Sequence, residues 1–71
     1  MLTDNAWMTV RQAPYEMVDT YVSGLLDIIA ANRGRTLPAH RRQLRLIWRD
    51  RALIKPSLLR RVAAVRQHRL Q

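Results

Sequence analysis

Cysteine is absent from this 71-residue chain, and acidic residues, lysine and glycine are scarce. Without cysteine the chain forms neither disulfides nor thiolate zinc sites, which fits a reducing compartment, and we expect a cytoplasmic protein. The longest apolar stretch, residues 25–31, is interrupted by Asp27, and no basic segment followed by an apolar run opens the chain. We therefore expect neither a signal peptide nor a membrane span.

The length of the chain limits its core. A chain of this size buries only about 60% of the surface that its unfolded form exposes. Its hydrophobic content of 48% is nevertheless too high for a disordered segment. We expect residues 1–71 to form a single domain that enlarges its core by association, as a homodimer.

Charge is divided unevenly along the sequence. Residues 1–32 carry a net charge of −3 and residues 33–71 one of +11, which together make the overall +8. Twelve of the thirteen basic residues are arginine. This asymmetry indicates a polyanionic partner, either a nucleic acid or an acidic protein surface, or acidic and basic faces that meet inside an assembly. We expect no small-molecule substrate.

Three prolines divide the chain into helical segments. Pro14, Pro38 and Pro56 each stand where a helix can begin, because the first helical position needs no backbone donor, and Gly34 is suited to ending a helix. The predicted fold class is all-α, a small helical hairpin or three-helix module with helices at 14–32, 38–53 and 56–69. In this arrangement residues 14–53 form a helical core, residues 56–71 a basic C-terminal helix, and residues 1–12 a flexible or strand-like N-terminal arm.

The first predicted helix has a broad apolar face. At 100° per residue, its apolar side chains, Met17 and Ile28 among them, cover about half of the circumference. One short helix cannot cover a face of this width, so we expect it to pack against a partner as well as within the chain. The residues predicted at a dimer or partner interface are Tyr21, Val22, Leu25, Ile29, Leu46 and Leu53.

The second predicted helix separates apolar from basic residues. Its apolar stripe consists of Leu37, Leu44, Ile47, Trp48 and Ile54, and its opposite flank carries Arg41, Arg42, Arg45 and Arg49. Arg51 falls within the apolar stripe, where a guanidinium needs a carboxylate, and we expect Asp27 or Asp19 to pair with it. In the third helix, Arg60 and Arg61 add a second basic element.

The two tryptophans have different expected roles. Trp48 lies on the apolar stripe, so we expect it to pack in the core rather than to stack on bases. Trp7 precedes the predicted helices, and its position is compatible both with an exposed anchor for a partner and with a packing residue.

Residues 6–12, AWMTVRQ, alternate in a period of two and suggest a short strand at 7–12. With Thr9 and Arg11 on that strand, Gly34-Arg35-Thr36 as a turn and residues 38–53 as a second helix, residues 7–53 resemble a ribbon-helix-helix dimer. This resemblance is the alternative fold, and it implies paired strands that read the DNA major groove. The first helix is longer than in that family, and a third basic helix follows.

Catalysis is not expected. His40 and His68 are far apart in the sequence, no cluster of acids and histidines suggests a metal site, and no nucleophile stands beside a base. We expect no cofactor and no catalytic residue. The sequence thus favours a small regulatory protein that contacts nucleic acid through Arg41, Arg42, Arg45, Arg49, Arg60 and Arg61. The alternative is an inhibitor or adaptor, such as a small mobile-element or phage protein, that binds a host protein through its apolar helix surface.

Overall fold

The computed structural model describes residues 5–32 and 37–68, and all regular structure in them is helical. Helix α1 spans Asn5–Val10, α2 spans Tyr15–Ala31, α3 spans Pro38–Arg49 and α4 spans Pro56–His68. A short 3-10 turn, η1, spans Arg51–Leu53. The predicted all-α class is confirmed, with four helices in the described residues instead of three.

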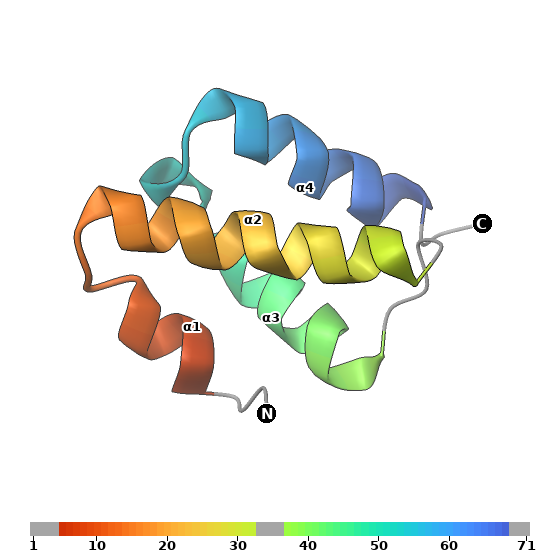
Figure 1. Cartoon of the computed structure of the whole chain (residues 1–71), viewed down its shortest axis with the longest axis horizontal. Coiled ribbons are helices and arrows are strands. Elements are labelled where there is room, and N and C mark those ends of the chain that lie inside the picture. The colour runs from red at the N-terminus through yellow and green to blue at the C-terminus, as the bar shows by residue number, and fades with distance from the viewer. Residues whose placement is uncertain (1–4, 33–36, 69–71) are drawn as a thin grey trace.

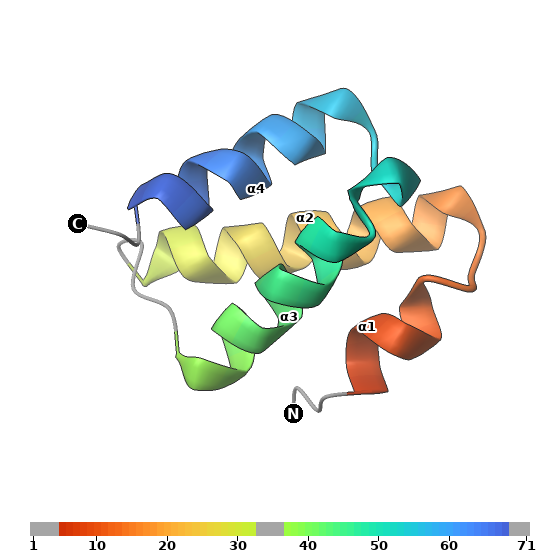
Figure 2. The same ribbon diagram turned by 180° about the vertical axis from the view of Figure 1, so that it is seen from behind.

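Helix α2 is the central element of the fold (Figure 1). It lies between α1 and α4, and α3 crosses behind it, as the reverse view in Figure 2 shows. Contacts join α2 to α4 and to α1, and α3 to α1 and to α4. Most of the broad apolar face of α2 is therefore covered within one chain, because three helices surround it, but Met17 and Ile28 stay exposed.

The core consists of one cluster of buried apolar side chains from every helix. Its largest contributor is α2, and α1 contributes a single residue, which is completely buried. The members are Trp7, Val18, Val22, Leu25, Leu26, Ile29, Leu44, Ile47, Ile54, Leu58 and Val62. Burial of about 1.5–3 kcal/mol per large apolar side chain makes this cluster the main stabilising feature of the fold.

Residues 5–10 form helix α1, so the short strand of the ribbon-helix-helix alternative is wrong for these residues. The alternation of six residues is too short to separate a period of 2 from one of 3.6. Contacts with α3 favour the helix. The Trp7 backbone N–H, in the first turn where helical donors have no partner of their own, donates to Gln43 Oε1 at 2.9 Å.

Gln43 is the main buried polar side chain that joins the helices. It is 1% exposed, and its Oε1 also accepts a hydrogen bond of 2.9 Å from the Tyr21 hydroxyl. The Trp7 and Tyr21 rings lie 6.2 Å apart between centroids. Partial burial raises the pKa of Tyr21, which keeps its hydroxyl protonated as a donor. One amide oxygen thus links α1, α2 and α3.

The second predicted helix ends at Arg49, four residues earlier than expected, and Pro56 starts a separate helix. Asp50 leaves the helical conformation, η1 follows, and Ile54 is extended, with φ −114° and ψ 151°. A proline disfavours the helical conformation for the residue before it and lacks the donor that a continuous helix would need. Residues 50–55 separate α3 from α4, so the chain forms two helices here and Pro56 does not kink a single one.

The bounds of α3 leave both Arg51 and Leu37 outside the helix. Both were placed on the apolar stripe by helical spacing, but Arg51 falls in η1, Leu37 precedes α3, and both are exposed. The predicted pairing of Arg51 with Asp27 or Asp19 is wrong. Arg51 Nη1 donates instead to the Trp48 carbonyl oxygen at 2.9 Å.

Candidate functional site

Four arginines occupy the outer side of α3, which we call the α3 basic face: Arg41, Arg42, Arg45 and Arg49. All four are exposed, and the residues that α3 buries, His40, Gln43, Leu44 and Ile47, lie on its other side. Pro38 begins the helix, and the spacing of the arginines keeps them within about a third of its circumference. The structure brings these four predicted site residues together.

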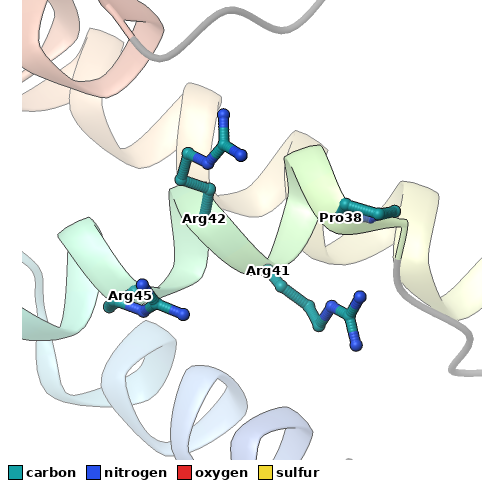
Figure 3. A pocket seen from close by; sticks show the side chains of 4 residues that line it. All are labelled: Pro38, Arg41, Arg42 and Arg45. Atoms are coloured by element: carbon teal, nitrogen blue, oxygen red, sulfur yellow. The ribbon is translucent and has the colours of Figure 1, made fainter.

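A shallow hollow of about 400 Å³ lies along the first two turns of α3. It is lined by Pro38, Arg41, Arg42 and Arg45. Figure 3 shows that Arg42 extends to one side of the helix, whereas Arg41 and Arg45 extend to the other. The hollow is therefore bordered by guanidinium groups, and its chemistry suits an anion rather than an apolar ligand.

Two acids of α2, Asp19 and Asp27, are engaged by cations outside the α3 basic face. Asp19 Oδ2 lies 3.6 Å from Lys55 Nζ, and Asp27 Oδ1 accepts a hydrogen bond of 3.0 Å from Arg61 Nη2. Lys55 precedes α4 and Arg61 lies within it, so both contacts tie α2 to the α4 segment. They leave Arg41 and Arg45 with no carboxylate partner among residues 5–32 and 37–68.

The carboxylate of Asp50 holds α1 against α3. Oδ2 accepts hydrogen bonds of 2.8 Å from Trp7 Nε1 and 2.8 Å from Arg49 Nη2, and it lies 3.6 Å from Arg11 Nε. Arg49 Nε donates to Oδ1 at 3.1 Å. Within the α3 basic face, Arg49 is thus oriented by its neighbour in sequence, with part of its charge compensated.

These contacts lower the pKa of Asp50 to about 2, mainly through the hydrogen bonds from Arg49, with smaller contributions from the Trp7 hydrogen bond and the Arg11 charge. The unfolded value is about 3.9. Because the folded pKa is the lower one, the ionised carboxylate stabilises the fold above pH 4, and this stabilisation is lost as the pH falls toward 2.

We therefore expect Asp50→Asn to lower stability at neutral pH by about 1–3 kcal/mol and to flatten the loss of stability between pH 4 and pH 2. Thermal melts of both proteins across this pH range measure the effect. Asp27→Asn is the control, since it removes an acid whose ion pair is exposed. A wild-type pH profile in Asp50→Asn would contradict the role given to Asp50.

The two arginines predicted on α4 do not lie together with the α3 basic face. Arg60 is exposed on the side of α4 opposite the buried Leu58 and Val62, and Arg61 is turned to α2 by its bond to Asp27. Arg60 and Arg61 were predicted to form one basic element because they are neighbours in sequence. The packing of α4 gives them different surroundings.

A second cationic group that the sequence did not predict lies where α3 meets α4. The guanidinium carbons of Arg51 and Arg66 lie 4.9 and 4.5 Å from the centroid of the Trp48 ring. We call Trp48, Arg51 and Arg66 the Trp48 cluster. The sequence could have indicated the contact between Trp48 and Arg51, because these residues are three positions apart. The contact of Arg66 with Trp48 depends on the packing of α4.

The residues predicted at a dimer or partner interface have mostly another role. Val22, Leu25 and Ile29 are at most 3% exposed inside a single chain, so they are core residues and not available to a partner. Tyr21, Leu46 and Leu53 are partly buried against the same core. Helix α1 occupies part of the space that a partner was expected to fill.

No family model, curated protein or solved structure matches this chain. Within residues 5–32 and 37–68, no three His, Asp or Glu side chains come together as a metal site requires. None of the helices described is long and apolar enough to cross a bilayer. The site is therefore characterised by its own chemistry, which is that of exposed guanidinium groups on α3 and α4.

Proposed function

We propose that the protein is a non-enzymatic nucleic-acid-binding protein whose α3 basic face contacts backbone phosphates. One observation carries this proposal: Arg41 and Arg45 are exposed and have no carboxylate partner in residues 5–32 and 37–68, while the acids Asp19, Asp27 and Asp50 are engaged by other cations. The positive charges of Arg41 and Arg45 are thus not balanced within the described part of the chain, and a polyanion supplies the missing negative charge.

The spacing of these side chains fits a phosphate backbone. Arg41, Arg45 and Arg49 succeed one another at intervals of four residues, so they extend over about 12 Å of helix. Guanidinium groups bind phosphate oxygens in a bidentate manner, and contacts of this kind position a protein on nucleic acid without reading its sequence. The predicted affinity is therefore strongly salt-dependent and weakly sequence-dependent.

The structure offers less support for the alternative of an inhibitor or adaptor. That hypothesis relied on the apolar face of α2 as a surface for a host protein. The centre of this face, at Val22, Leu25 and Ile29, is buried against the other helices. A homodimer remains a prediction, for which Tyr21, Leu46 and Leu53 are the proposed residues that keep some exposed surface.

A titration of the protein against a short DNA duplex at two salt concentrations tests the proposed function. Log affinity should fall with log salt with a slope of about −0.9 for each phosphate neutralised. In Arg41→Gln/Arg45→Gln we expect affinity at low salt to fall roughly tenfold or more and the slope to weaken by about two. Helicity and melting temperature should stay close to those of the wild type, since exposed charges contribute little to stability.

Arg60→Gln/Arg61→Gln is the matched control, because it removes the same charge from α4, away from the α3 basic face. It should lower affinity much less than Arg41→Gln/Arg45→Gln. If both double variants lost the same affinity, binding would depend on net charge alone and not on the α3 basic face. A wild-type protein that fails to bind nucleic acid at low salt would refute the proposed function.

A further inference from the structure

The Trp48 cluster places two positive charges next to one aromatic ring. Arg51 comes from η1 and Arg66 from the last turns of α4, so segments that are distant along the chain supply the two guanidinium groups. Neither has a carboxylate partner among the described residues, and the Asp50 carboxylate is already bound by Trp7 and Arg49. The cluster therefore presents concentrated positive charge with no carboxylate counterion in residues 5–32 and 37–68.

Contacts within the cluster restrict both arginines before any ligand binds. Arg51 is held twice, by the ring and by its hydrogen bond to the Trp48 carbonyl oxygen, and Arg66 is only partly exposed beside the ring. Cation–π contacts of this kind contribute modestly at an exposed site, but they order long side chains. Less conformational entropy is then lost when an anion binds both guanidinium groups.

The same contacts make Trp48 a poor surface for stacking bases. The ring is already partly buried, and two guanidinium groups lie over it. Trp7 is fully buried, and the Tyr21 ring is partly buried with its hydroxyl bonded to Gln43. Proteins that bind single strands without sequence preference rely on accessible aromatic faces, and Tyr15, the remaining aromatic residue, is a single exposed ring at the first position of α2.

The Trp48 cluster adjoins the α3 basic face. Arg45 precedes Trp48 by three residues and Arg41 precedes it by seven, so all three lie on neighbouring turns of one side of α3. Arg66 then extends this side onto α4 through its contact with the ring. Arg41 and Arg45 thus lie on the same side of α3 as Trp48, the ring that Arg51 and Arg66 contact.

We propose that the Trp48 cluster is a phosphate-binding site, and that the nucleic acid bound by this protein is a duplex, contacted through its backbone and not by base stacking. This inference rests on the proposed function and names its substrate class. Arg51 and Arg66 bind phosphate oxygens, and Trp48 is a positioning residue that orders them.

Binding of a labelled duplex, and of one of its strands alone, tests the inference on the full chain. The wild type should bind the duplex more tightly than the single strand. Arg51→Gln/Arg66→Gln should weaken the salt slope for the duplex by about two, whereas Arg60→Gln/Arg61→Gln, which removes equal charge, should change it less. Trp48→Leu should lower duplex affinity by roughly 2- to 10-fold and single-strand affinity by no more than that.

Each opposite result overturns the inference. If Trp48 stacks on bases, Trp48→Leu should reduce single-strand binding by roughly 5- to 100-fold and spare the duplex. If Arg51→Gln/Arg66→Gln kept the wild-type salt slope, Arg51 and Arg66 would not bind phosphate. This test does not depend on whether Trp48→Leu folds. These results are distinct from failure of the proposed function, in which the wild type itself binds neither duplex nor single strand.

Discussion

Leu25→Asp is expected to unfold the protein. Leu25 is 3% exposed at the centre of the α2 face that packs on the other helices. A carboxylate there has no partner, and its desolvation costs several kcal/mol, which is comparable to the whole stability of a small domain. Circular dichroism at 25 °C should show loss of most helical signal and of a cooperative thermal transition.

Ile28→Asp is the matched control for this variant. Ile28 lies three residues later in the same helix and on the same predicted apolar face, but it is 48% exposed. The same carboxylate should cost less than about 1 kcal/mol there, because it keeps its hydration. Equal destabilisation by both changes, or a folded Leu25→Asp, would contradict the packing of α2 described above.

Trp7→Ala is the second substitution with a large expected effect. The side chain is fully buried, and its Nε1 donates to Asp50. Truncation of a buried tryptophan costs about 3–5 kcal/mol and leaves a cavity between α1 and α3. We expect a large fall in the midpoint of urea denaturation, together with a raised pKa of Asp50, which loses one of its donors.

Thr9→Ala serves as the control in the same helix. Thr9 is exposed, and the change removes no contact with α3. Its denaturation midpoint should stay near the wild-type value. If Trp7→Ala also kept that midpoint, α1 would not be part of the cooperative fold, and the N-terminal segment would be the flexible arm that the sequence suggested.

The helices of residues 15–49 were predicted closely, because their signals are local. Prolines at 14, 38 and 56 mark helix starts, and the periodicity of α3 places Arg41, Arg42, Arg45 and Arg49 on its exposed side. In a regular helix the spacing of residues fixes the side on which each side chain lies, so the α3 basic face follows from sequence positions alone. The same reasoning failed beyond Arg49, where the chain leaves the helix and spacing no longer gives direction.

Periodicity did not predict how the helices pack against one another. The apolar face of α2 predicts burial for both Leu25 and Ile28, yet only the placement of α1, α3 and α4 around it covers the first and leaves the second exposed. The partner expected to cover this face was in part helix α1, whose six residues are too few to define a helical period without their contacts to Gln43 and Asp50.

Charge shows the same division between local and long-range information. The excess of arginine after residue 32 is a property of composition and is independent of the fold. Which arginines keep unpaired charge depends on distances of a few ångströms between segments far apart in sequence, such as Arg61 to Asp27 and Arg11 to Asp50. Such contacts form only after the helices pack, because packing of the whole chain selects which side chains meet, and local spacing does not.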